Sequence, residues 1–120
     1  MNQKPPLKVI IVEDEIAIRQ QMEDFLQRQP EFVVTGACGT VHEALVLMRA
    51  TKPDLFILDT ELPDGTGFDI LKQIPENSRV LFLVNPWERD ARRALGLAAI
   101  EYLLKPTDGK EFINVFASAN

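Results

Sequence analysis

The apolar residues of this chain alternate between two periods, and this alternation constrains the fold more than any other feature. Short, nearly continuous apolar runs are typical of strands buried on both faces of a sheet. They occupy residues 7–12, 32–35, 55–58, 80–84 and 102–104. Between these runs and after the last of them, apolar residues recur at helical spacing, which predicts amphipathic helices. The helical stripes span residues 18–26, 41–48, 68–74, 87–98 and 112–116.

Strands that alternate with helices predict an α/β domain with right-handed crossovers, a parallel sheet, and helices on both of its faces. The length of 120 residues allows a single domain over 1–120. Residues 1–6 are expected to form a flexible N-terminus. Thr40 followed by Glu43 fits a capping box at the start of the second helix.

Charge and cysteine content exclude several classes of function. The net charge of −5 gives no positive field for nucleic acid or an anionic membrane. A lone cysteine, Cys38, cannot form an internal disulfide, and with a lone histidine, His42, no zinc-ligand set exists. No apolar run reaches the length of a signal peptide or a membrane span. We therefore expect a cytoplasmic protein that binds no membrane.

Charged residues follow three of the predicted strands. In an open α/β sheet, ligands bind outside the carboxyl ends of the strands. If strands one, three and five are neighbours, then Glu13, Asp14, Asp59 and Lys105 converge there. Each of them alone also fits a structural role, because acids stabilise helix N-termini and Asp often ends a strand in a turn. Because all four would lie at the same edge of the sheet, their joint position favours a functional site over separate structural roles.

Three carboxylates in one place repel one another unless a cation lies among them. Mg²⁺ suits such a place, because it takes oxygen ligands and commonly binds one or two carboxylates together with a phosphate. A lysine opposite the metal would supply positive charge for a phosphoryl oxygen. Phosphoryl transfer to a carboxylate is the chemistry that this arrangement favours.

Three segments in this order and spacing resemble a response-regulator receiver domain of two-component signalling. They are Val-Glu-Asp-Glu at 12–15, Leu-Asp-Thr-Glu-Leu-Pro-Asp-Gly-Thr-Gly at 58–67 and Tyr-Leu-Leu-Lys-Pro at 102–106. The resemblance implies a doubly wound, flavodoxin-like fold with five parallel strands in the order 2-1-3-4-5 and five helices. Residues 62–67 and 100–106 are further similar to receivers that precede LytTR-type DNA-binding domains.

The resemblance implies a chemical role for five residues. Asp59 would accept a phosphoryl group from a histidine kinase or phosphotransfer protein. Glu13 and Asp14 would be the acidic pair that binds Mg²⁺, and the backbone carbonyl of Glu61 would be a further metal ligand. Lys105 would contact the phosphoryl group.

A second set of residues would transmit the effect of phosphorylation to the rest of the domain. Tyr102 would be the aromatic switch residue, and the bond before Pro106 would be cis. The family usually has Thr or Ser where this chain has Val84, which offers no hydroxyl to a phosphoryl oxygen. Asn85 could substitute for this hydroxyl through its side-chain amide, but it also fits the helix cap before the following proline.

Three hypotheses about function follow. In the first, phosphorylation of Asp59 changes the face of the fourth helix, fifth strand and fifth helix, which then changes partner or forms a homodimer. DNA would be bound only by an output domain outside this chain. In the second, Val84 marks a phosphorylation-independent protein-binding module. The third, an enzyme with steady turnover, is disfavoured because an Asp-x-Asp phosphatase needs Asp where Glu61 stands.

Overall fold

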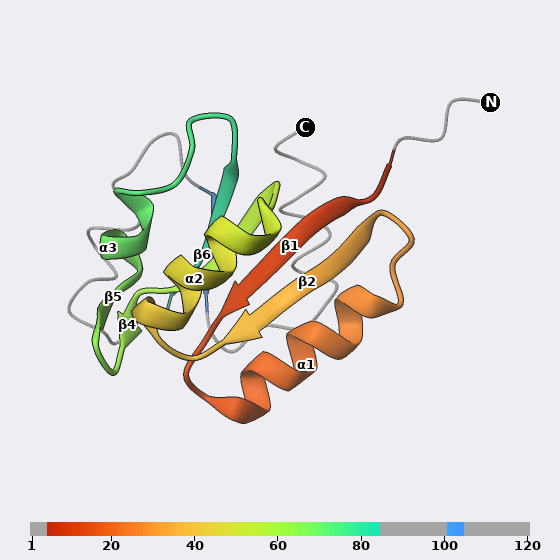
Figure 1. Ribbon diagram of the computed structural model, residues 1–120. Coiled ribbons are helices and arrows are strands. Elements are labelled where there is room, and N and C mark those ends of the chain that lie inside the picture. Colours follow the sequence, from red (N-terminus) through yellow and green to blue (C-terminus); the bar gives the residue numbers. More distant parts are fainter. Residues whose placement is uncertain (1–4, 85–100, 105–120) are drawn as a thin grey trace.

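The computed structural model describes residues 5–84 and 101–104. Strands within these residues are β1 (Leu7–Val12), β2 (Phe32–Cys38), β3 (Leu55–Asp59), β6 (Arg79–Val84) and β7 (Glu101–Leu104). They form one parallel sheet in the order β2-β1-β3-β6-β7. The helices are α1 (Ile16–Gln27), α2 (Val41–Thr51) and α3 (Gly67–Leu71), and a small hairpin joins β4 (Glu61–Leu62) to β5 (Gly65–Thr66) (Figure 1).

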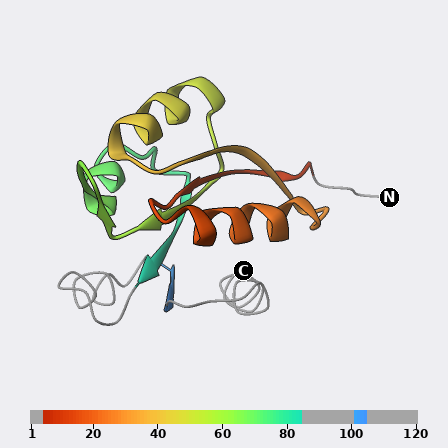
Figure 2. The same ribbon diagram turned by 90° about the horizontal axis from the view of Figure 1, so that it is seen from below.

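The sheet is covered on both faces. Figure 2 shows α1 on one side of the strands and α2 on the other. Alternate residues of a strand point to opposite faces, so each face carries its own apolar cluster. One cluster joins α1, through Met22 and Leu26, to Val9, Ile11, Leu55, Ile57, Leu81 and Leu83. The other joins α2 and α3, through Ala44, Met48, Phe68 and Ile70, to Ile10, Val12, Phe56, Leu58, Val80, Phe82 and Val84.

The parallel pairing of the strands confirms the predicted sheet, and the two clusters confirm that its strands are buried on both faces. The order of the first four strands, β2-β1-β3-β6, is also as expected. The stripes at 87–98 and 112–116, which predicted a fourth and a fifth helix, lie outside the described residues. The five-helix count therefore stays a prediction, as does the flexible N-terminus. No helix in the described part of the chain is long and apolar enough to cross a membrane.

Strand β2 is longer than the sequence predicted. The apolar pattern indicated 32–35, whereas the strand continues to Cys38. Pairing with β1 shifts between Val9 and Ile10, because Val9 faces Val34 and Ile10 faces Gly36. Thr35 is the extra residue at this irregularity, and its hydroxyl donates to the Val9 carbonyl at 3.3 Å. A bulge followed by glycine breaks the alternation by which a strand is recognised in sequence.

Helix α3 is shorter than predicted. The apolar stripe indicated a helix that includes Ile74, but the helix ends at Leu71. The N–H groups of Gln73 and Ile74 donate to carbonyls three residues earlier, at Ile70 and Leu71. Such bonds tighten the end of a helix, and the residue before Pro75 is disfavoured in α-helical geometry. Ile74 still packs against the cluster below α3.

We predict that Leu26→Ala destabilises the protein by about 2–5 kcal/mol, because it removes a large side chain from a packed core. Leu26 is fully buried between α1 and the sheet. The control is Val46→Ala on α2, whose side chain is 53% exposed and whose effect should stay within about 0.5 kcal/mol. Urea denaturation followed by circular dichroism measures both. Equal midpoints for the two variants would contradict the packing described here.

Candidate functional site

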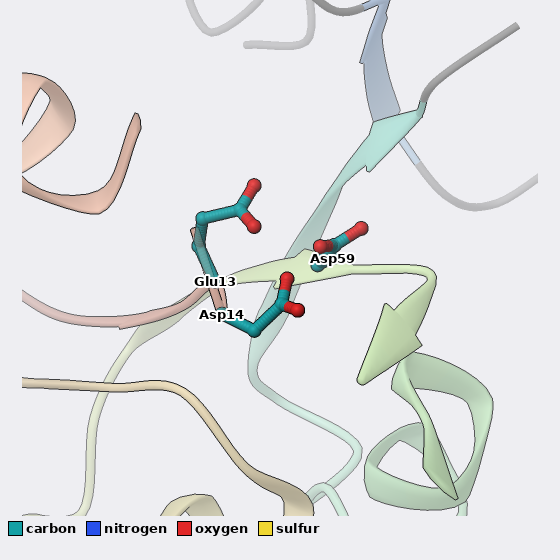
Figure 3. A group of neighbouring side chains, drawn as sticks. All are labelled: Glu13, Asp14 and Asp59. Carbon is teal, nitrogen blue, oxygen red and sulfur yellow. The ribbon is translucent and has the colours of Figure 1, made fainter. Parts of the chain in front are cut away.

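The carboxyl ends of β1 and β3 lie side by side. The two strands are parallel, and Val12 pairs with Leu58 at the last position of their shared register. Glu13 follows one of these residues and Asp59 the other, so both acids come to the same edge of the sheet. Glu13, Asp14 and Asp59 each offer one carboxylate oxygen within 4.8 Å of the other two. Figure 3 shows the first two at the end of β1 and the third at the end of β3.

The three acids differ in burial. Glu13 is 0% exposed and Asp59 is 2% exposed, whereas Asp14 is exposed to solvent. Buried like charges are costly unless a cation or hydrogen bonds compensate them. Hard oxygen donors with one open side match Mg²⁺, which prefers oxygen ligands and keeps several of its waters. The donor set therefore fits a divalent cation of this kind.

The backbone at Glu13 is fixed from both sides. Its N–H donates to the Cys38 carbonyl at 3.0 Å, and its carbonyl accepts from Arg19 Nη1 at 2.9 Å. Its carboxylate Oε2 also accepts from the N–H of Glu15 at 3.1 Å. A Cβ at Gly39 would lie 2.9 Å from Arg19 Nη1, so this glycine leaves room for the guanidinium. The turn after β1 is thus held against both β2 and α1.

Burial raises the pKa of the Cys38 thiol to about 11 from its ordinary 9.0. The thiol therefore stays protonated at neutral pH, although the backbone carbonyl of Cys38 is hydrogen-bonded to the N–H of Glu13. It packs in the apolar cluster that faces α2. The residue adds no charge to the acidic group.

The backbone at Asp59 is held closely by the start of α3. The N–H of Gly67 donates to the Thr60 carbonyl at 3.1 Å. A Cβ at position 67 would clash with the Asp59 carbonyl oxygen and come within 2.8 Å of the Phe82 ring. The N–H of Glu61 in turn approaches Asp59 Oδ1 at 3.4 Å. Glycine at position 67 is therefore required by the close approach of two backbone segments.

The hairpin after Asp59 is anchored at its turn. Asp64 accepts from the N–H groups of Val41 and His42, at 2.7 and 3.0 Å. These two bonds hold the pKa of the Asp64 carboxyl below its ordinary value. On the other side, Thr66 and Asp69 form a reciprocal capping box at the start of α3.

The structure brings together three of the predicted site residues, Glu13, Asp14 and Asp59. Glu61 lies next to them, with its side chain exposed on β4. Val84 is fully buried at the end of β6. Tyr102 lies in β7, where its backbone pairs with Phe82.

Three further predicted residues, Asn85, Lys105 and Pro106, lie outside the described residues. Leu104, the last residue of β7, pairs with Val84 at the end of β6. The strand that precedes Lys105 thus ends at the same edge of the sheet as β1, β3 and β6. The convergence of Lys105 with the acidic group stays a prediction.

The model of the response regulator receiver domain family matches residues 9–117. The chain belongs to this family. Among curated relatives, the receiver is 32% identical over 110 residues to the sensory transduction protein LytT of Bacillus anthracis. It is 30% identical over 103 residues to the transcriptional regulatory protein BtsR of Escherichia coli K12. It is 36% identical over 110 residues to the DNA-binding transcriptional activator DevR/DosR of Mycobacterium tuberculosis.

These matches cover 89%, 85% and 88% of the receiver, but only 44%, 43% and 50% of the three relatives. The chain thus spans half of these relatives' length or less. The resemblance to a receiver domain is confirmed, and the LytT relatives are consistent with a regulator of the LytTR type.

Solved structures agree on the fold. The receiver domain of AraT from Geobacillus stearothermophilus superimposes with a TM-score of 0.78 at 26% identity, and the match covers 94% of this chain and 92% of that one. The response regulator domain of Thermotoga maritima CheB gives a TM-score of 0.78 at 23% identity, covering 95% and 96% of the two chains. The second likeness supports the fold alone.

Two residues that shape the site, Arg19 and Asp64, were not predicted from the sequence. Arg19 lies on a helix face where a solvated charge is the default expectation, and Asp64 stands between proline and glycine in an ordinary turn pattern. Both act through bonds to backbone groups of other elements, which no local pattern encodes. The capping box of Thr66 and Asp69 was also missed, although its spacing is visible in the sequence.

We predict that Gly67→Ala destabilises the receiver by about 1–3 kcal/mol, because the new methyl group meets backbone that cannot move aside. The matched control is Gly36→Ala, whose methyl group would meet the flexible end of the Leu47 side chain at 2.9 Å. Chemical denaturation of both variants tests this difference. A cost for Gly67→Ala no larger than for the control would contradict the close approach at Asp59.

Proposed function

We propose that Asp59 accepts a phosphoryl group from a histidine kinase or phosphotransfer protein in a Mg²⁺-dependent reaction, and that the receiver thereby switches a transcriptional output. One observation carries the proposal: Glu13, Asp14 and Asp59 come from adjacent strand ends and offer oxygens within 4.8 Å of one another. Two of these acids are buried, which is costly unless charge or hydrogen bonds compensate.

Asp59 is the nucleophile in this proposal. One carboxylate oxygen forms a bond to phosphorus while the bond from phosphorus to the donor breaks, and the leaving imidazole keeps that electron pair and takes a proton. Glu13 and Asp14 would hold Mg²⁺ together with the backbone carbonyl of Glu61. When bound, the ion neutralises charge on the carboxylates and on the phosphoryl oxygens. Lys105 would supply a further positive charge to the phosphoryl group.

The receiver would act as a cytoplasmic signalling domain that assists only its own phosphorylation and dephosphorylation. The printed names of its relatives include a sensory transduction protein, a transcriptional regulatory protein and a DNA-binding transcriptional activator. By analogy, DNA would be bound by an output domain outside this chain. The signal would leave through the face of the fourth helix, fifth strand and fifth helix, by a change of partner or by homodimerisation.

We predict that incubation with acetyl phosphate and Mg²⁺ adds one phosphoryl group to the parent protein and none to Asp59→Asn, because the amide is not a nucleophile of this kind. Intact mass measures the gain. Asp24→Asn is the control, since Asp24 is exposed on α1 and accepts from Gln20. Removal of Mg²⁺ with a chelator should suppress labelling of the parent. Equal labelling of Asp59→Asn would refute the assignment.

Val84 supports a second candidate, a protein-binding module that phosphorylation does not switch. The side chain is fully buried at the end of β6 and carries no hydroxyl. A hydrogen bond to a charged group contributes about 1.5–3 kcal/mol net. Inverting a two-state equilibrium from 1:99 to 99:1 needs about 5.5 kcal/mol of differential binding. The missing hydroxyl would therefore remove a large part of the driving force while leaving the acceptor chemistry intact.

We predict that Val84→Thr increases the effect of a phosphoryl mimic on the chain after β6. Hydrogen exchange of residues 85–104 is measured with and without beryllofluoride and Mg²⁺, in the parent and in the variant. Val80→Thr, at the other end of the same apolar run in β6, controls for a buried hydroxyl distant from the site. A larger response in Val84→Thr alone supports a switch limited by the missing hydroxyl. Equal responses in the parent and both variants would show that Val84 does not limit coupling.

A further inference from the structure

Asp64 connects two elements that are distant in the sequence. It lies in the turn between β4 and β5, and its two carboxylate oxygens accept from the first N–H groups of α2, at Val41 and His42. The bonds measure 2.7 and 3.0 Å and join residues 23 and 22 positions apart. Figure 1 shows the hairpin beside the beginning of α2.

The N-terminus of α2 explains why these bonds form. The first N–H groups of a helix have no partner within the helix, and its dipole favours a negative charge there. The Thr40 hydroxyl accepts a hydrogen bond from the N–H of Glu43 at 3.1 Å. The Asp64 carboxylate accepts from the two preceding N–H groups of the helix, those of Val41 and His42. The usual local cap is thus completed by a side chain from another part of the chain.

The turn also packs against α2. A Cβ at Gly65 would lie 3.1 Å from Val41 Cγ2, so the hairpin turn comes close to the first residue of the helix. This steric contact is independent of the carboxylate bonds. Both observations indicate that the turn has a fixed position on α2.

The other end of the hairpin reaches the acidic site. Glu61 pairs with Thr66, and Leu62 pairs with Gly65 next to the turn. The Glu61 N–H approaches Asp59 Oδ1, and under the proposed function its carbonyl is a ligand of Mg²⁺. Each strand of the hairpin is only two residues long. Where its turn is held therefore determines where the Glu61 backbone lies.

We propose that Asp64 is a positioning residue for the metal site, which it serves by fixing the β4–β5 hairpin to α2 so that the Glu61 backbone is aligned with Asp59. This inference rests on the proposed function, because it assigns Glu61 a part in binding Mg²⁺. It gives Asp64 a role in metal binding although its side chain contacts α2 and lies outside the acidic group.

The test measures Mg²⁺ binding to the full chain by titration calorimetry, and the Mg²⁺ concentration that gives half-maximal labelling by acetyl phosphate. Asp64→Ala should raise both values about three- to tenfold, near or below the effect usual for groups that orient metal ligands. Asp64→Asn should raise them less, because its amide oxygen still accepts from one N–H. Asp24→Ala, which removes an exposed acid from α1, should leave both values unchanged.

Thermal unfolding of each variant separates positioning from stability. A lower melting temperature for Asp64→Ala with unchanged Mg²⁺ values in folded protein would overturn the proposal. If Asp64→Ala does not fold, Asp64→Asn carries the same test, and unchanged Mg²⁺ values there overturn it equally. A parent protein that binds Mg²⁺ but is not labelled would refute the proposed function alone, since the calorimetric comparison still decides the role of Asp64.

Discussion

The parallel pairing of β1 with β3 is the constraint on which the rest of the site depends. The register runs from Val9 opposite Leu55 to Val12 opposite Leu58, and these strand residues are buried. Charge inside such a sheet would be very costly, so the acids of β1 and β3 lie at or just beyond the carboxyl ends of these strands. Because parallel strands end at the same edge, acids that are far apart in sequence become neighbours there. The site is thus a consequence of where the apolar core stops.

Acids that repel one another keep a fixed arrangement only if the backbone that carries them is restrained. Glu13 is restrained by bonds from β2 and from Arg19 on α1, and Asp59 by the close approach of Gly67. These restraints act on the backbone of the two acidic residues and not on their carboxylates. The acidic group therefore rests on both helical layers of the domain, since α1 holds one end and α3 the other.

The sequence was sufficient for the strands but not for every boundary. Runs such as 55–58 predict buried strands correctly, because helices cover both faces of this sheet. The bulge at Thr35 interrupts the pattern of β2, so its second half is not recognised in the sequence. The acidic group was predicted from strand ends, and the roles of its members came from the family resemblance. Asp64 was missed because its partners lie in another element, and such partners are set by tertiary packing. Lys105 lies beyond the described residues.

The sheet also acts as a partition. One apolar cluster lies wholly on the α1 side and the other wholly on the α2 and α3 side, so few side chains are shared between them. Substitutions at sites that share no partners have nearly additive effects on stability. Each layer can therefore diverge during evolution without forcing compensating changes in the other. Substitutions on the α1 side can therefore accumulate while the hairpin and its hydrogen bonds to α2 are preserved.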